Sequence, residues 1–274
     1  MTKAALRFLP DKPAHQLIRV RNALVTYGIY MYCRSFPKLS RRTLRRMAKI
    51  QLPKGYPVDV HFKPKYEPWD QRLCMIPSGD FYTAIRSGKA DVVTISGSLP
   101  RGVEADYYAK ITGIAENAGA KVLLDTSGAS LEAALKSEIK PELVKPNLTE
   151  INGLLGTSFT TDDVDELRAA LASDARFSDI PWVVVSMGAA GSVGFHNGRA
   201  FRAKTPDIPA VNATGSGDST IAGFAHAIAA GADDETVLRT ANTCGKLNAM
   251  DPMTGHLVMD RWDEVYNGVV VTEL

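Results

Sequence analysis

The chain has 274 residues, of which 45% are hydrophobic and 23% charged, the balance of a soluble globular protein with room for one large α/β domain or two small ones. Its net charge of +2 conceals an asymmetry, because residues 1–75 carry 16 basic and four acidic side chains whereas the rest of the chain is acidic overall. No apolar run is long enough to cross a bilayer, the start lacks a clear signal-peptide core, and three scattered cysteines form no CxxC pair. We therefore expect a cytoplasmic protein without a membrane span, a disulfide framework or a zinc site.

The basic first part of the chain is broken by prolines and shows no regular alternation of strands and helices. Only Leu39–Ile50 has helical spacing. We expect residues 1–88 to form an atypical, poorly packed segment and residues 89–274 to form an α/β domain. Arginines such as Arg41 and Arg42 would attract a phosphate backbone, but no stacking aromatics or known nucleic-acid-binding module accompany them. A basic surface without a nucleic-acid partner is the expectation.

From residue 91 onward, buried-strand patterns alternate with helical patterns. The expected strands are Asp91–Ser96, Lys121–Gly128, Glu142–Asn147, Trp182–Ser186 and Ser192–His196. The expected helices are Glu104–Gly119, Leu131–Ile139, Asp162–Ser173, Gly217–Ala230 and Glu235–Ala249. Strands joined by helices form right-handed βαβ units, so this part of the chain predicts a parallel sheet with helices on both faces.

Polar turns follow several of these strands, at the edge of the sheet where α/β proteins bind ligands. They are Ser96–Ser98, Asp125–Gly128, Lys145–Asn147 and Ser186–Gly191. Their convergence predicts a ligand site at the carboxyl ends of the strands, without identifying the ligand.

The stretch Val211–Gly231 places two glycines and a serine before an acid and a long alanine-rich helix. A helix N-terminus has unpaired N–H groups and a partial positive charge, and Gly215 and Gly217 would let an anion approach the backbone. Asp218, at the start of the helix, could accept a proton from a hydroxyl. From these residues alone, a catalytic anion site and an ordinary N-cap are equally good interpretations.

The segment Thr214–Phe224, TGSGDSTIAGF, resembles the C-terminal signature of the ribokinase-like, or PfkB-type, sugar kinases. Five further segments resemble the tagatose-6-phosphate kinase and 1-phosphofructokinase branch of this family, in the same order. They are Ser96–Ala109, Leu123–Leu131, Val144–Ile151, Val183–Ser192 and Thr254–Met259. The resemblance covers about residues 89–274 and implies the ribokinase-like α/β fold, with a mainly parallel sheet.

The resemblance also implies transfer of a phosphoryl group from ATP, with Mg²⁺, to a hydroxyl of a phosphosugar. Asp218 would act as the base, and the N–H groups of Gly215, Ser216 and Gly217 would hold the phosphate charge. Tagatose 6-phosphate is the expected substrate, because Asn212 and the C-terminal tail resemble that branch more closely. Fructose 1-phosphate is the alternative.

The segment around Lys145 carries a second part of the resemblance. Lys145 and Asn147 would lie at the nucleotide, and Glu150 matches the glutamate of the family's N-x-x-E element, which helps to organise hydrated Mg²⁺. The same residues also fit a helix start, with Asn147 as the cap and Glu150 completing a capping box. The two interpretations are compatible.

Two further nucleotide contacts are implied by the resemblance. Ser186, Gly188 and Gly191 match the nucleotide-binding S-x-G-x-x-G turn, although the turn alone would equally fit a hairpin. Asn248 stands where the family cradles adenine, and a solvent-facing asparagine is the alternative.

The resemblance fails in residues 1–88. The family's N-P-A-x-D-like segment, its G-G-K-G-x-N loop and its T-R-x-N segment do not occur there. In the family these segments bind the sugar and its phosphate, and the same region supplies the lid strands that form a homodimer in many relatives. Two expectations follow: an active sugar-phosphate kinase, or a remnant that keeps the ATP site without the sugar pocket. A homodimer is expected only if lid strands exist that the sequence does not reveal.

Overall fold

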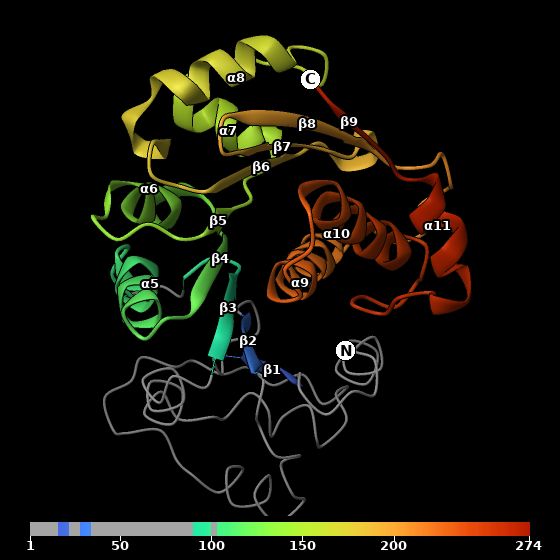
Figure 1. The fold of residues 1–274 in the computed structure, drawn as a ribbon, viewed down its shortest axis with the longest axis horizontal. Coiled ribbons are helices and arrows are strands. Elements are labelled where there is room, and N and C mark those ends of the chain that lie inside the picture. The colour runs from blue at the N-terminus through green and yellow to red at the C-terminus, as the bar shows by residue number, and fades with distance from the viewer. Residues whose placement is uncertain (1–15, 22–27, 34–89, 100–102) are drawn as a thin grey trace, which may run out of the picture.

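The computed structural model describes residues 16–21, 28–33, 90–99 and 103–274. In these residues nine strands form one sheet, in which the strands lie side by side in chain order (Figure 1). The strands are β1 Gln16–Arg21, β2 Gly28–Cys33, β3 Ala90–Ser96, β4 Lys121–Asp125, β5 Leu143–Val144, β6 Trp182–Ser186, β7 Ser192–His196, β8 Arg199–Lys204 and β9 Val270–Glu273. The helices are α5 Tyr107–Asn117, α6 Gly128–Lys136, α7 Leu148–Leu155, α8 Val164–Ser173, α9 Ser216–Ala229, α10 Asp234–Ala249 and α11 Trp262–Gly268, with short 3₁₀ turns at Ala175–Phe177, Gly188–Ala190 and Met259–Arg261.

The sheet is parallel in its centre and antiparallel at both sides. β3, β4, β5 and β6 are parallel, since helices return the chain between them. β6 to β9 are antiparallel, and so are β1, β2 and β3. The expected parallel sheet is therefore confirmed for the centre, whereas the antiparallel strands β8 and β9 were not predicted. β9 is short and partly exposed, so it carries little of the apolar pattern of a strand.

Two strands lie in the basic segment where the sequence predicted none. β2 pairs with β3 from Gly28 opposite Ser96 to Cys33 opposite Ala90, and β1 pairs with β2. The sheet thus continues across the boundary placed at residue 88. The surrounding basic residues and prolines obscured these two six-residue runs. The helix expected at Leu39–Ile50 and the arginines within it lie outside the described residues, and the division into two parts stays a prediction.

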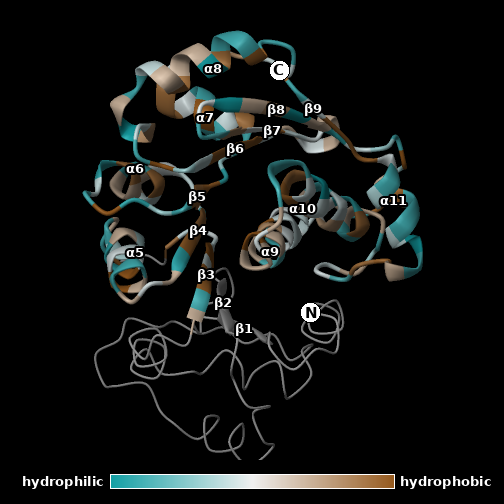
Figure 2. Cartoon of the chain, in the orientation of Figure 1, coloured by the Kyte–Doolittle hydropathy of each residue, from teal (hydrophilic) through white to brown (hydrophobic). Residues whose placement is uncertain are grey.

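Alternate residues of the central strands point into two separate cores, because side chains along a strand face opposite sides of the sheet. Val93 and Ile95 pack with helices α5 to α8 on one face. Val92 and Leu123 pack with α9 and α10 on the other face. The hydropathy colouring shows apolar residues along these strands between the two helical layers (Figure 2). Helices on both faces, as predicted, are confirmed.

The layer of α9 and α10 depends on one close approach of their backbones. A Cβ added to Gly223 of α9 would lie 2.7 Å from the Cα atom of Ala241 and 3.0 Å from the sulfur of Cys244, both in α10. Cys244 itself is buried, and burial raises the pKa of its thiol to about 12. The close approach explains why a helix interior contains glycine despite its entropic cost.

We predict that Gly223→Ala lowers the free energy of unfolding by about 1–3 kcal/mol, because the added methyl group overpacks the contact between the helices. Gly153 of α7 is the matched control, since a Cβ there would meet nothing within 4 Å. Gly153→Ala should raise the free energy of unfolding by about 0.4–1 kcal/mol through its higher helix propensity. Urea denaturation of both variants checks the pair, and equal effects would contradict the packing argument.

Candidate active site

The turn before α9 is built on a glycine in the left-handed region. Gly215 has φ 85° and ψ 0° and is the N-cap of the 14-residue helix. A Cβ at this position would lie 2.8 Å from the Cγ2 atom of Thr254 and 3.2 Å from the backbone nitrogen of Gly255. Any larger residue would therefore be both strained and in collision. The N–H of Ser216, the first residue of α9, donates to the carbonyl of Ala213 at 3.1 Å, and the turn lies at the N-terminus of the helix, the end at which anions bind.

Asn248, near the end of α10, holds this turn in place. Its Nδ2 atom donates hydrogen bonds to the carbonyl of Thr214 and to the Oγ atom of Ser216, both at 3.0 Å. Its Oδ1 atom accepts from the N–H of Gly255 at 2.6 Å. The residue is 0% exposed, so the solvent-facing interpretation of Asn248 is wrong. The bonds give it a positioning role, and contact with adenine stays a prediction.

Asp218 lies in the first turn of α9, partly buried, as the sequence predicted. The hydroxyl of Ser96 donates a hydrogen bond of 2.5 Å to the Oδ1 atom of Asp218. Ser96 is the last residue of β3 and is 4% exposed. Sequence analysis placed the Ser96 turn at the ligand edge of the sheet but assigned this side chain no role. Nothing in the spacing of residues 96 and 218 could have paired them.

A buried ion pair lies beside this carboxylate. The Nζ atom of Lys145 is 3.1 Å from the Oδ2 atom of Asp125, which ends β4. The pair lies against Gly217 of the turn, because a Cβ there would lie 3.3 Å from the Asp125 carboxylate and 3.7 Å from the Lys145 ammonium. Burial raises the pKa of Asp125 above its ordinary value, the charge of Lys145 opposes this shift, and the charge of Asp218 adds to it. The three side chains therefore belong to one electrostatic cluster; the sequence predicted roles for Lys145 and Asp218 and placed Asp125 in a turn at the ligand edge without a role.

Glu150 completes the capping box of α7 and is within electrostatic reach of this cluster. Its Oε2 atom accepts from the N–H of Asn147 at 2.8 Å, and its own N–H donates to the Oδ1 atom of Asn147 at 2.9 Å. The capping-box interpretation is confirmed. Burial raises the pKa of the Glu150 carboxyl, and the charge of Asp125 raises it further while Lys145 lowers it. The carboxylate is thus within electrostatic reach of the Asp125–Lys145 pair, and the metal-linked role stays a prediction.

The S-x-G-x-x-G turn joins the antiparallel strands β6 and β7, so the hairpin interpretation of this turn is correct. Ser186 forms an isolated bridge with Asn147, which places the two predicted nucleotide segments side by side. Gly188 and Gly191 have φ of 57° and 85°. A Cβ on Gly191 would lie 2.0 Å from the carbonyl oxygen of Ala203, so this glycine is required by contact with β8. The contact of the turn with a nucleotide is untested.

The stretch of sequence that carries this cluster matches the model of a described family. The family model for pfkB family carbohydrate kinases matches residues 78–259. The chain belongs to the pfkB carbohydrate kinase family. The match includes every residue of the cluster built around Asp218.

Relatives of this pfkB family member include two proteins named tagatose-6-phosphate kinase from strains of Staphylococcus epidermidis, 43% and 42% identical over 186 residues. The alignment covers 68% of this chain and 59% of each relative, so the chain matches about three fifths of their length. The crystal structure of phosphofructokinase-2 from Escherichia coli in complex with substrates and products is 26% identical, with a TM-score of 0.58. That comparison covers 69% of this chain and 62% of the other.

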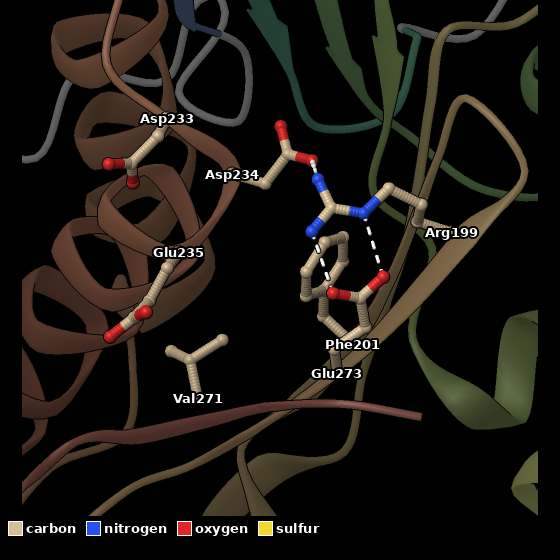
Figure 3. A pocket seen from close by; sticks show the side chains of 7 residues that line it. All are labelled: Arg199, Phe201, Asp233, Asp234, Glu235, Val271 and Glu273. Carbon is tan, nitrogen blue, oxygen red and sulfur yellow. Dashed lines mark hydrogen bonds and ion pairs between the residues drawn. The ribbon is translucent and has the colours of Figure 1, made fainter.

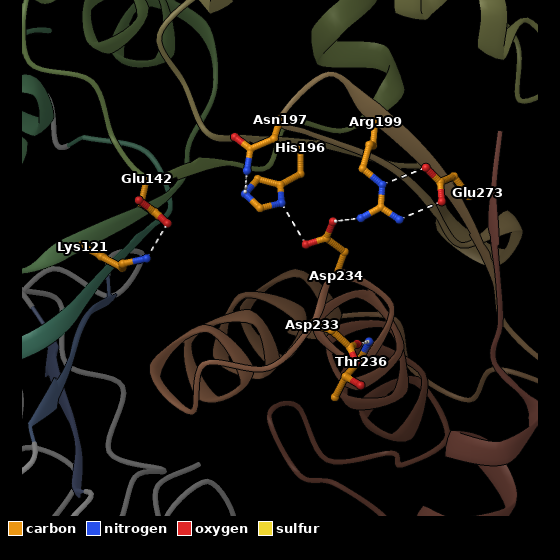
Figure 4. Close-up of polar contacts among 9 residues, drawn as sticks. All are labelled: Lys121, Glu142, His196, Asn197, Arg199, Asp233, Asp234, Thr236 and Glu273. Atoms are coloured by element: carbon orange, nitrogen blue, oxygen red, sulfur yellow. Dashed lines mark hydrogen bonds and ion pairs between the residues drawn. The ribbon is translucent and has the colours of Figure 1, made fainter.

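A surface pocket of the pfkB domain lies apart from this cluster. Its volume is about 240 Å³, and Figure 3 shows its lining of Arg199, Phe201, Asp233, Asp234, Glu235, Val271 and Glu273. Figure 4 shows that its charges are satisfied locally: Arg199 bonds Glu273 and Asp234, and Asp234 also contacts His196 at 2.8 Å. None of the predicted site residues lines this pocket. The pocket lies between β8, β9 and the start of α10, and we assign it no part in the chemistry.

Neither a preformed metal site nor a membrane-spanning helix is found among the residues that the structure describes. No three His, Cys, Asp or Glu side chains of the described part of the chain come together as a metal site. No helix among these residues has the length and apolarity that a membrane span requires.

We predict that Asn248→Asp lowers the free energy of unfolding by about 1–3 kcal/mol. The substitution keeps the size and the acceptor of the side chain but removes the donor to Thr214 and Ser216, and it buries a charge. Asn117→Asp, at an exposed position near the end of α5, is the control and should change the value by less than about 0.5 kcal/mol. Thermal unfolding checks both, and a small effect of Asn248→Asp would show that the turn is held by other contacts.

Proposed function

We propose that the chain transfers the γ-phosphoryl group of ATP to a hydroxyl of a ketose phosphate, with tagatose 6-phosphate as the preferred substrate. One observation carries the proposal: a carboxylate, Asp218, lies at the start of α9 in a glycine turn whose Gly217 closely approaches the Asp125–Lys145 ion pair. The names of the Staphylococcus epidermidis relatives support the choice of sugar. Fructose 1-phosphate is the second candidate from the same branch.

The arrangement supports a simple division of labour. Asp218 would accept the proton of the sugar hydroxyl while the bond from its oxygen to the γ-phosphorus forms and the bond to the leaving ADP oxygen breaks. The N–H groups of Gly215, Ser216 and Gly217 would hold the charge on the phosphoryl oxygens, aided by the helix dipole. Lys145 lies next to Gly217 and would add positive charge at the same place.

The remaining predicted residues would hold the nucleotide and its metal. Asn147 and Ser186 lie on adjacent segments, next to the turn that contains Gly188 and Gly191. Glu150 fits Mg²⁺, because this ion is commonly bound through one or two carboxylates together with substrate phosphates and water. Bound there, Mg²⁺ would neutralise part of the phosphate charge.

We predict that Asp218→Asn lowers kcat by about 10²–10⁴-fold, because the amide cannot accept the proton, and leaves ATP affinity nearly unchanged. A coupled ADP-release assay with tagatose 6-phosphate and fructose 1-phosphate measures turnover, and calorimetry measures ATP binding. Asp165→Asn, at an exposed acid in the first turn of α8, is the control. A variant that retains full turnover would exclude Asp218 as the base.

We predict that Glu150→Gln raises the Mg²⁺ concentration needed for half-maximal activity by about tenfold, because glutamine keeps the capping box but lacks the charge. The experiment separates the two roles of this residue. A role in capping alone would leave the Mg²⁺ requirement unchanged. Thermal unfolding of the same variant, expected to stay close to that of the parent, verifies that the cap is retained.

A second candidate is a nucleotide-binding remnant without sugar kinase activity. Two observations favour it: the chain matches 59% of the length of its named relatives, and residues 1–88 lack the sugar-binding motifs of the family. Loss of sugar orientation would remove much of the rate. ATP binding without turnover of any phosphosugar would support this candidate over the kinase.

We also propose a cytoplasmic location and a homo-oligomer. A solved form of phosphofructokinase-2 from Escherichia coli is described as tetrameric. Light scattering of the purified full chain measures the oligomeric state directly.

A further inference from the structure

The hydroxyl of Ser96 lies between two carboxylates. It donates the 2.5 Å hydrogen bond to Oδ1 of Asp218, and it lies near enough to the side chain of Asp125 to lower the pKa of that carboxyl. A hydroxyl has one proton to donate, so at any moment it can serve only one of the two carboxylates as donor. Ser96 is 4% exposed at the end of β3, where its backbone is held on both sides by β2 and β4. The hydroxyl of Ser96 is therefore a buried part of the sheet and not a surface contact.

We propose that Ser96 is a positioning residue, which fixes the orientation of the Asp218 carboxylate and couples its protonation to that of Asp125. The inference rests on the proposed function, because Asp218 is the base in that reaction. Ser96 would act through Asp218 and is not itself a catalytic residue.

The surroundings make such a bridge consequential. Asp125 is paired with the ammonium of Lys145, and Glu150 is the other acid whose charge acts on this pair. When Ser96 donates to Asp218, it stabilises the charged carboxylate that can accept a proton. When Asp218 has taken the proton of the sugar hydroxyl, the same hydroxyl can turn its hydrogen to Asp125. Each carboxylate thus loses its donor only when the other gains it.

The test compares Ser96→Ala with Ser96→Thr in the full chain. We expect Ser96→Ala to lower kcat by about 10–100-fold with little change in the KM for ATP, since the base is misoriented and not removed. Loss of the donor also disfavours the charged base, so the acidic limb of the pH–kcat profile should move to higher pH. Ser96→Thr keeps the hydroxyl and should restore both the rate and the pH profile.

Thr112→Val is the matched control, because it removes a fully buried hydroxyl whose hydrogen bond stays within α5. It should leave kcat and the pH profile unchanged. If Ser96→Ala does not fold, Ser96→Cys carries the same comparison with a weaker donor of similar size. A pH profile of Ser96→Ala that coincides with the parent profile would overturn the inference.

A readout without catalysis separates failure of this inference from failure of the proposed function. The hydroxyl of Ser96 lowers the pKa of Asp125, so in ¹³C-carboxyl NMR Asp125 should titrate at higher pH in Ser96→Ala than in the parent and in Ser96→Thr. A parent chain without sugar kinase activity would reject the function while this titration still tests the bridge. Equal titration of Asp125 in all three proteins would reject the bridge alone.

Discussion

The position of the glycine turn depends on one buried asparagine. Asn248 binds the turn at Thr214 and Ser216 and also the loop at Gly255. Because Asn248 belongs to α10 and the turn starts α9, the geometry of the turn follows from the packing of these two helices. That packing is fixed in turn by the close approach at Gly223. The geometry of the site therefore depends on the packing of α9 against α10. A substitution between these helices would displace Asp218 without contacting it.

Negative charge exceeds positive charge within the site. Asp125, Asp218 and Glu150 are carboxylates that act on one another, and Lys145 is the ammonium paired with them. Burial, together with their mutual repulsion, raises the pKa of Asp125 and of Glu150. Keeping the cluster ionised therefore costs free energy. A cation that arrives with a nucleotide would relieve this repulsion. In the proposed function, the cluster would suit a metal-bound phosphate ligand better than an anion alone.

The sequence predicted local features well and long-range ones poorly. The strands Trp182–Ser186 and Ser192–His196 and the capping box at Asn147 are observed as predicted, because each depends on neighbouring residues. The bond between Ser96 and Asp218 joins residues 122 positions apart, and no local pattern reports it. Asn248 was assigned by resemblance to the ligand, whereas its buried bonds are to the protein. Its environment is set by three segments that meet only in the folded chain.

The pairing of β2 with β3 gives the basic N-terminal segment a structural part in the site. Gly28 of β2 is the partner of Ser96 in this ladder, and Asp125 of β4 is its partner on the other side. Without β2, β3 would be an edge strand, and the backbone that carries Ser96 would lose its hydrogen bonds on that side. The described strands β1 and β2 therefore support the backbone that carries Ser96, although this segment carries none of the family's sugar-binding motifs. In the proposed function, they would help to align the base at this edge of the sheet.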